Sequence, residues 1–244
     1  MEQILKNGFT ELGEELSQEK ISALIQYARL LQEWNEKINL TAITDDEGIA
    51  TKHFLDSASA LLTGKVKGKV IDVGTGAGFP GLVLKTVRPQ IELTLLDSLN
   101  KRINFLKEVS SELSLDGIDF VHGRAEDFGV NAKYREKFDT VVSRAVARLS
   151  VLAEWCLPFV KQGGYFLALK GPLADEELKE AERAIYVLGG EVEEVFEVKI
   201  PFTDLSHKII IIKKVRHTPP KYPRKPGIAV KSPIETCYNL SKNK

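Results

Sequence analysis

Residues 70–81 read VIDVGTGAGFPG, and this stretch decides the fold. A short apolar segment, Val70 to Val73, runs into a cluster of glycines, and a helical pattern begins at Gly81. Glycines let the backbone turn tightly and approach a ligand that a Cβ would keep away. The free N–H groups at the start of the following helix add hydrogen-bond donors. A strand, a glycine loop and a helix in this order predict a site for a nucleoside-containing cofactor.

A second carboxylate strengthens this interpretation but leaves the cofactor open. Asp97 closes the next apolar segment, 23 residues after Gly74, where it can accept hydrogen bonds from both hydroxyls of a ribose. Residues 76–81 satisfy the dinucleotide pattern G-x-G-x-x-G, whereas residues 74–78 read G-x-G-x-G after Asp72. A carboxylate at Asp72 suits the cationic amino-acid end of a sulfonium cofactor and repels a pyrophosphate. The loop therefore favours a sulfonium cofactor, with a nicotinamide dinucleotide as the alternative.

Strand and helix patterns continue to alternate beyond this loop. Strand-like segments span residues 91–96, 118–121, 138–142, 165–169, 192–200 and 208–215, and helical patterns lie between most of them, at 81–87, 101–111, 149–160 and 175–188. This spacing is typical of βαβ units on a parallel sheet buried on both faces. The turn between the last two strands is too short for a parallel crossover. We therefore expect a Rossmann-like α/β sheet of seven strands, the last of them antiparallel.

The first 60 or so residues carry a helical pattern instead. Residues 17–38 place apolar side chains at steps of three and four, which predicts an amphipathic helix with Ser17 as its N-cap. Residues 4–16 and 45–62 predict two more helices. We divide the chain into a helical N-terminal extension (1–64), an α/β core (65–216) and a basic C-terminal tail (217–244).

Composition narrows the class of protein. Of the 244 residues, 43% are apolar, which is enough for a sizeable core, and 34 basic side chains balance 34 acidic ones. The longest apolar segments are far shorter than a membrane span, and no secretory signal is visible. Two cysteines, Cys156 and Cys237, are too few for a disulfide scaffold or a four-ligand zinc site. We expect a cytoplasmic globular protein with no metal site and no membrane contact.

The balanced charge hides a basic segment. Eight Lys or Arg and no acidic residue lie between Lys208 and Lys231, whereas nine acidic residues lie between Asp175 and Glu197. A separate basic segment on a neutral protein favours local contact with a polyanion, although a solvated tail has the same composition.

An ordered set of short segments extends over nearly the whole chain. In chain order these are Asn39-Leu40-Thr41, His53 with Asp56-Ser57, the glycine loop, Leu96-Asp97-Ser98 with Lys101-Arg102, Arg124-Ala125-Glu126, Phe138-Asp139, Ser143-Arg144-Ala145, Leu169-Lys170-Gly171 and Tyr222-Pro223-Arg224. The set resembles the glucose-inhibited division protein B family. These are class I S-adenosylmethionine-dependent methyltransferases that act on N7 of a guanine in bacterial small-subunit (16S) ribosomal RNA.

The resemblance implies a set of site residues. The cofactor-binding residues that it implies are Gly74, Phe79, Ala125, Glu126 and Arg144, with Gly76 and Gly78 in the same loop. Asp72 and Asp97 fit the general pattern of the class for the amino-acid end and the ribose of S-adenosylmethionine. Arg144 follows the fourth strand, where donor and acceptor are expected to meet, and is the candidate catalytic residue.

Missing motifs agree with transfer to a ring nitrogen. Ser143 and Arg144 stand where enzymes that methylate exocyclic amines carry Asn or Asp before two prolines, and Thr218-Pro219-Pro220 lies after the last strand. Neither Cys156 nor Cys237 is placed to act as the nucleophile that carbon-5 methylation needs. Guanine N7 carries an in-plane lone pair and no proton, so its methylation needs only in-line approach, without a base or a covalent intermediate.

Two groups of residues are candidates for RNA contact. Arg224 and Lys231 lie in the basic tail, where Tyr222 is available to stack on a base. The other group comprises Asn39, His53, Lys101, Arg102, Arg124 and Lys170. We expect a monomer that binds small-subunit ribosomal RNA or the small subunit itself. A nicotinamide-dependent oxidoreductase and a non-catalytic RNA-binding regulator on the same fold are the alternatives.

Overall fold

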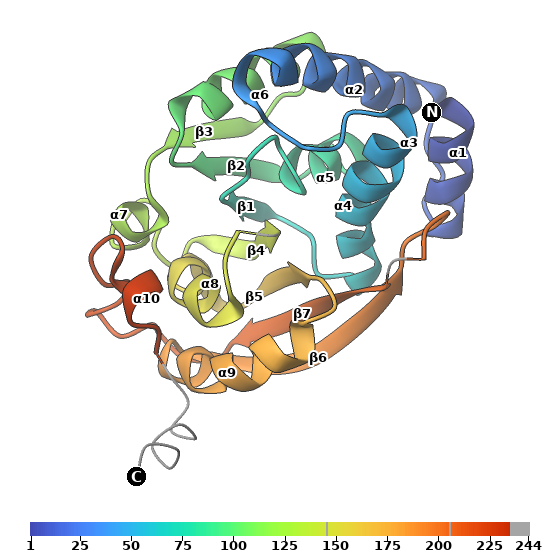
Figure 1. The fold of residues 1–244 in the computed structure, drawn as a ribbon. Coiled ribbons are helices and arrows are strands. Elements are labelled where there is room, and N and C mark those ends of the chain that lie inside the picture. The colour runs from blue at the N-terminus through green and yellow to red at the C-terminus, as the bar shows by residue number, and fades with distance from the viewer. Residues whose placement is uncertain (145, 205, 235–244) are drawn as a thin grey trace.

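A seven-stranded sheet forms the centre of the molecule, as the computed structural model shows for residues 1–144, 146–204 and 206–234 (Figure 1). The strands are β1 (Lys69–Val73), β2 (Glu92–Asp97), β3 (Ile118–His122), β4 (Phe138–Arg144), β5 (Val160–Lys170), β6 (Gly190–Lys199) and β7 (Ser206–Lys214). Their order across the sheet is β3-β2-β1-β4-β5-β7-β6. Strands β1 to β5 pair in parallel, and β7 lies antiparallel between β5 and β6. The expected seven-stranded sheet with its antiparallel last strand is confirmed.

Helices cover both faces of this sheet (Figure 1). One face carries α1 (Glu2–Glu11), α2 (Gln18–Ile38), α3 (Asp46–Gly48), η1 (Ile49–Leu55), α4 (Asp56–Ala58), η2 (Ser59–Thr63), α5 (Gly81–Val87) and α6 (Asn100–Glu112). The other face carries α7 (Ala125–Gly129), α8 (Leu149–Cys156) and α9 (Ala174–Val187), and α10 (Ile228–Lys231) lies against α8. Neighbouring residues of a strand pack on opposite faces, as Val70 and Ile71 do, so the sheet separates two apolar clusters.

The N-terminal helices belong to the same core as the sheet. Helix α2 begins at the expected cap, where the Ser17 side chain accepts a hydrogen bond from the Lys20 N–H, and it ends at Asn39 with a positive φ of 48°. Leu24 and Leu31 of α2 pack in one cluster with Val70 of β1 and Phe105 of α6. The division into residues 1–64, 65–216 and 217–244 stays a proposal about the sequence.

Several boundaries differ from the sequence prediction. Residues 45–62 form four short helices without a break, in which η1 winds as a π-helix and η2 as a 3-10 helix. Helix α8 ends at Cys156 rather than at residue 160, since Pro158 lacks the N–H that a helix needs. Strand β5 begins five residues earlier than expected, because Gly163 and Gly164 hide the strand pattern. Helices α7 and α10 were not predicted.

The strand order creates a switch point beside the glycine loop. Strand β1 pairs with β2 on one side and β4 on the other, so the connections that follow β1 and β4 leave in opposite directions. Ligands bind at such a point, outside the carboxyl ends of the strands. The glycine loop starts there, where the N–H groups of Gly74 and Thr75 both donate to the Leu96 carbonyl.

Candidate active site

Three cavities adjoin along the carboxyl edge of the sheet. The rear cavity, of about 200 Å³, lies between β1, β2, α7 and α8. The loop cavity, of about 390 Å³, lies between the glycine loop, η1 and the end of β4. The outer cavity, of about 560 Å³, lies between η1, α4, β5 and β7. Gly74 and Asp97 line both the rear and loop cavities, His53 and Arg144 line both the loop and outer cavities, and Val146 lines all three.

Helix α2 of the N-terminal extension supports the glycine loop through a hydrogen bond. The buried Tyr27 hydroxyl of α2 donates to the carbonyl of Ala77. Gly78 has a φ of +94°, and a Cβ there would lie 2.3 Å from that hydroxyl oxygen. Gly74, with a φ of +74°, faces Val146, and its Cβ would lie 2.8 Å from a methyl group of Val146. Both glycines are therefore required by backbone conformation and by close contact.

Asp72 lies beneath this loop rather than in a cavity wall. Its side chain is fully buried, and Oδ2 accepts hydrogen bonds from the Thr75 hydroxyl and the Gly81 N–H. Burial raises the pKa of Asp72 to about 6, against the opposing effect of these two hydrogen bonds. The side chain ties the end of β1 to the start of α5, and the expectation that Asp72 faces the amino-acid end of the cofactor stays a prediction.

Asp97 stands where the rear and loop cavities meet. Its oxygens accept hydrogen bonds from the N–H groups of Gly76 and Leu99, at 2.9 Å each, and from the Arg102 guanidinium at 3.4 Å. An ionised carboxylate has about four acceptor positions. One position is therefore free for a ligand hydroxyl in the present arrangement, and a second becomes free if Arg102 moves.

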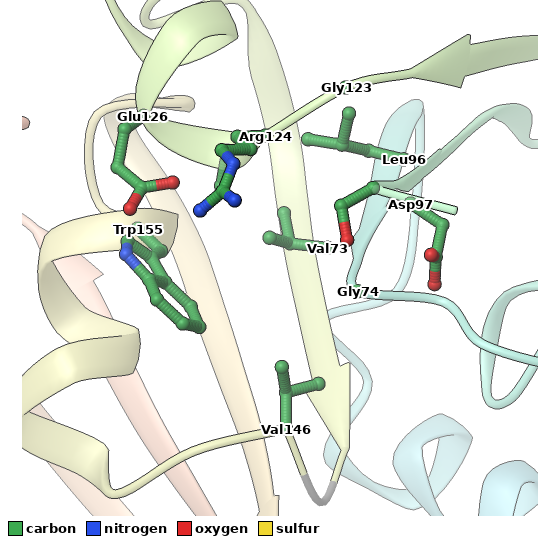
Figure 2. A pocket seen from close by; sticks show the side chains of 11 residues that line it. Val73, Gly74, Leu96, Asp97, Gly123, Arg124, Glu126, Val146 and Trp155 are labelled. Carbon is green, nitrogen blue, oxygen red and sulfur yellow. The ribbon is translucent and has the colours of Figure 1, made fainter. Parts of the chain in front are cut away.

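The rear cavity has polar groups at both ends (Figure 2). Figure 2 shows the Glu126 carboxylate and the indole nitrogen of Trp155 at one end, with Asp97 at the other. Glu126 is 6% exposed and accepts a hydrogen bond from the Gly227 N–H. The Trp155 nitrogen is buried and has no hydrogen-bond partner among the described residues. A slot of this shape, with Ala125 also in its wall, fits a flat, mainly apolar ring that has a few polar edge atoms.

Arg144 lies at the wall between the loop and outer cavities. Its Nη1 donates to the Asp56 carboxylate at 2.6 Å and to the Lys52 carbonyl at 3.0 Å, and its Nη2 lies 3.3 Å from Nδ1 of His53. The guanidinium also stands over the Phe79 ring, 5.1 Å from its centre. These contacts hold Arg144 in one orientation at the end of β4.

His53 is a buried part of this wall, and its expected contact with RNA stays a prediction. Its ring stacks on Phe79 at 4.5 Å between centres. Because guanidinium groups only donate, Nδ1 of His53 accepts a hydrogen bond from Arg144. Nε2 therefore carries the proton of the ring and donates a hydrogen bond to the Thr41 hydroxyl oxygen at 2.8 Å. Burial and the nearby charge of Arg144 lower the pKa of His53 to about 4. The ring is therefore neutral at physiological pH, and both of its nitrogens already have partners.

Three further residues expected to contact RNA have partners within the chain. Arg224 binds Glu154, whose side chain is 1% exposed, through four hydrogen bonds that include its backbone N–H. Lys170 is 6% exposed and pairs with Glu177 at 2.8 Å. Arg102 pairs with Asp97 and lines the loop cavity. The partner carboxylate lies 70 residues away for Arg224, seven for Lys170 and five for Arg102, and the expected contacts of these three residues with RNA stay predictions.

The basic segment is also largely folded back on the protein. Lys208 pairs with Asp175, Lys213 with Glu193, and the fully buried Lys214 with Glu136. Tyr222, expected to stack on a base, packs against the apolar cluster beneath α8. Asn39, Lys101, Arg124 and Lys231 remain exposed, and Arg124 lies beside the rear cavity.

Other predicted features are placed away from the cavities. Cys156 is fully buried at the end of α8, and burial raises the pKa of its thiol, whereas Cys237 lies outside the described residues. The Thr218 hydroxyl is buried and donates to the Leu188 carbonyl, so the Thr-Pro-Pro sequence is structural. The described part of the chain contains no cluster of metal-ligating side chains and no helix long and apolar enough to cross a membrane.

Sequence reasoning missed three residues of the site. Tyr27 belongs to a helix interpreted only as packing material, Trp155 falls within an apolar helix, and His207 stands at the edge of the basic segment. The apolar period of α2 and α8 marks Tyr27 and Trp155 as inward-facing, but no local signal says what they face.

Solved structures share this fold. TrmN from Thermus thermophilus superposes with a TM-score of 0.50 at 18% identity, covering 68% of this chain and 53% of that chain. A precorrin-6y C5,15-methyltransferase from Geobacter metallireducens gives a TM-score of 0.50 at 14% identity, covering 65% of this chain and 87% of that chain. The sheet order, the antiparallel β7 and the glycine loop at the switch point define a Rossmann-like fold that this chain shares with these methyltransferase structures.

Relatives by sequence are much more similar. A protein named ribosomal RNA small subunit methyltransferase G from Alkaliphilus oremlandii is 56% identical over 96% of this chain and 99% of its own length. A protein of the same name from Clostridium novyi is 53% identical over 90% of this chain and 91% of its own. Residues 20–206 match the family model described as rRNA small subunit methyltransferase G, and the chain belongs to that family.

Proposed function

We propose that this protein transfers the methyl group of S-adenosylmethionine to N7 of a guanine in small-subunit (16S) ribosomal RNA. The observation that supports this best is the shared wall of His53, Arg144 and Val146, which line both the loop cavity and the larger outer cavity. A donor in the first cavity and an acceptor in the second meet at that wall. The family to which the chain belongs supplies the substrate class.

The residues of the first two cavities fit the cofactor. Glu126 offers an acceptor to an adenine amino group, we assign Asp97 to the ribose hydroxyls, and a Cβ at Gly74 would lie 2.8 Å from Val146 at the junction of the two cavities. S-adenosylmethionine supplies an electrophilic methyl group on a sulfonium. Gly76 and Gly78 shape the loop, and Phe79 forms the floor beneath Arg144.

The acceptor side suits a nucleophile that has no proton to lose. His53 is neutral, and both of its nitrogens have partners. The family reaction needs orientation more than proton transfer, because guanine N7 presents its lone pair directly. Holding the two reactants in line corresponds to an effective molarity of roughly 10⁵–10⁸ M. Arg144 is the candidate residue that fixes this alignment.

Binding of RNA is assigned to four exposed polar or basic side chains. Asn39 and Lys101 lie on the α2 and α6 side, Arg124 lies beside α7, and Lys231 lies at the end of α10. We further propose that the protein acts as a cytoplasmic monomer on the small subunit or its RNA. The nicotinamide and regulator alternatives are not favoured, given the family and the shared wall between the cavities.

The test is transfer of tritiated methyl from S-adenosylmethionine into small ribosomal subunits prepared without the modification, followed by digestion to nucleosides. A labelled 7-methylguanosine peak is expected. Absence of label, together with micromolar binding of S-adenosylhomocysteine by calorimetry, would leave the cofactor site in place and refute the substrate.

A further inference from the structure

The outer cavity contains a pair of residues that the proposed function leaves unexplained. Asp56 of α4 and His207 of β7 lie 151 residues apart in the sequence, and His207 Nδ1 is 2.6 Å from Oδ1 of Asp56. The other oxygen of Asp56, Oδ2, accepts the hydrogen bond from Arg144 at 2.6 Å. One carboxylate therefore holds both an imidazole and a guanidinium on the same wall of the cavity.

Burial shows which member of this group faces the cavity. The Asp56 side chain is 5% exposed, whereas that of His207 is 23% exposed. A carboxylate only accepts, so His207 donates its Nδ1 proton to Asp56. Nε2 of His207 then has no hydrogen-bond partner among the described residues. Arg144, in contrast, already directs three of its five N–H groups to Asp56, Lys52 and His53.

We infer that the outer cavity receives the acceptor guanine and that protonated His207, positioned by Asp56, donates a hydrogen bond from Nε2 to O6 of that base. This inference rests on the proposed function. It makes His207 a substrate-binding residue and Asp56 a positioning residue for both His207 and Arg144.

The chemistry of the base explains why a donor belongs here. Guanine presents two acceptors on one edge, N7 and O6. N7 has to stay free to receive the methyl group, which leaves O6 as the atom on that edge that a protein donor can hold. Adenine carries an amino donor in place of O6, so a donor in the site rejects adenine. His207 is paired with the buried Asp56 carboxylate, so a base edge suits it better than a phosphate.

The charge state of His207 is set by its neighbours. The hydrogen bond and charge of Asp56 raise the pKa of His207 above its ordinary value of 6.5, against the effects of burial and Arg144. Burial raises the pKa of Asp56, but the hydrogen bond from His207 and the charge of Arg144 outweigh it and hold that pKa below 3.8. Lys52, Lys170 and Glu177 are the other charged groups that line the cavity. Nε2 is a donor only while the ring is protonated, so substrate binding weakens as pH rises through the His207 pKa.

Two substitutions distinguish the role of His207 as a hydrogen-bond donor from its role as a positive charge. His207→Gln keeps a donor near the Nε2 position at every pH, whereas His207→Phe removes it. The matched control is His217→Gln, since Nδ1 of His217 also lies 2.6 Å from a carboxylate, that of Glu136, but the side chain is 73% exposed and away from the cavities. Each protein is assayed for methyl transfer to unmodified small subunits from about pH 6 to about pH 9, which brackets an elevated histidine pKa. Thermal melting and calorimetry with S-adenosylhomocysteine accompany every assay.

The expected result is specific to this assignment. His207→Phe lowers kcat/KM by roughly 10- to 100-fold at the acid end of the range, as expected for a hydrogen bond from a charged donor. His207→Gln retains most of the activity and loses the alkaline fall that the wild type shows, and the affinity for S-adenosylhomocysteine stays unchanged in both.

Four other outcomes would overturn the inference. Equal activity of His207→Phe and wild type refutes the contact while leaving the proposed function standing. Loss in His207→Gln as large as in His207→Phe, with a salt slope lower by about 0.7, assigns His207 to an RNA phosphate instead. A lower melting temperature with an unchanged pH profile makes His207 structural. If wild-type protein binds the cofactor but labels no subunits, the proposed function and this inference fail together.

Discussion

Nη1 of Arg144 lies 2.6 Å from Oδ2 of Asp56, joining two residues that are 88 positions apart in the sequence. Both side chains are mostly buried, at 14% and 5% exposed. The pair connects the end of β4 to the helical segment of the N-terminal extension. It fixes the guanidinium at the wall between the loop and outer cavities.

Arg144→Ala is expected to lower methyl transfer far more than cofactor affinity. Misplacing the reactants at this wall costs about 100-fold in rate, whereas the rear cavity and Asp97 are untouched. Stability falls by about 1–3 kcal/mol, because Asp56 keeps only its hydrogen bond from His207. The measurements are transfer kinetics, calorimetry with S-adenosylhomocysteine and urea unfolding. Arg216→Ala, which removes an exposed guanidinium over the Tyr186 ring, is the control. A fall in affinity alone would make Arg144 a cofactor-binding residue only.

Gly74→Ala is expected to abolish or severely weaken binding of S-adenosylhomocysteine. The new Cβ meets Val146 at 2.8 Å at the junction of the rear and loop cavities. Gly13→Ala is the matched control, since Gly13 has nearly the same φ, +73° against +74°, and nothing within 4 Å of its Cβ position. In both variants the strained backbone lowers the free energy of unfolding by about 1 kcal/mol. A loss of cofactor affinity in Gly74→Ala alone, measured by calorimetry, therefore reports on the site and not on strain. Equal affinities in the two variants would refute the assignment of the cavities.

Trp155 is expected to report cofactor binding by its fluorescence. The indole lines the rear cavity, and the second tryptophan, Trp34, is hydrogen-bonded to Glu108 away from it. Trp34→Phe leaves Trp155 as the single tryptophan. Titration with S-adenosylhomocysteine then gives a saturable change in emission, with a midpoint that matches calorimetry. An unchanged spectrum at full occupancy would place the adenine elsewhere.

Asp72→Asn is expected to remove a pH dependence from the free energy of unfolding. The folded-state pKa of about 6 lies above the ordinary 3.8, so the native state binds the proton more tightly than the unfolded chain. The ionised form therefore destabilises the fold, with no effect below pH 3.8 and the full effect, about 3 kcal/mol, above pH 6. Urea unfolding between these limits should show the wild type losing stability relative to the variant. Parallel curves across that range would contradict the prediction.

Arg224→Ala is expected to reduce stability rather than RNA affinity. It leaves the buried Glu154 carboxylate without its partner, which costs about 3–5 kcal/mol. Lys231→Ala, at an exposed position, is expected to leave stability unchanged and to lower the salt slope of RNA binding by about 0.7. Denaturant unfolding measures the stability of each variant, and binding of small-subunit RNA at several salt concentrations measures its salt slope. The reverse pattern would restore Arg224 to the RNA-binding surface.

The sequence predicted what short-range patterns encode. The glycine loop, the Ser17 cap and the short turn before β7 each act within a few residues, and each is where it was expected. The Arg124-Ala125-Glu126 segment was also found, because its position after β3 brings it to the same edge of the sheet as Asp97.

The sequence could not predict which distant residue each charge contacts. In the sequence, Arg224 belongs to a basic tail. Its partner Glu154 lies 70 residues earlier, and only the fold brings the two side chains into contact. His207 acquires its partner only when β7 inserts beside β5 and reaches α4. Such pairs depend on the complete topology, so local composition placed Arg224 among the RNA contacts and gave no role for His207.

The order in which the chain is synthesised bears on how the hydrogen bond from Tyr27 to Ala77 can form. A ribosome synthesises residues 18–38 before residues 74–81, so α2 is available as a support when the glycine loop emerges. Were the order reversed, the loop would have to wait, with its positive-φ glycines unsupported, for a helix still to be translated. The direction of synthesis thus allows the support of the cofactor site to precede the site itself.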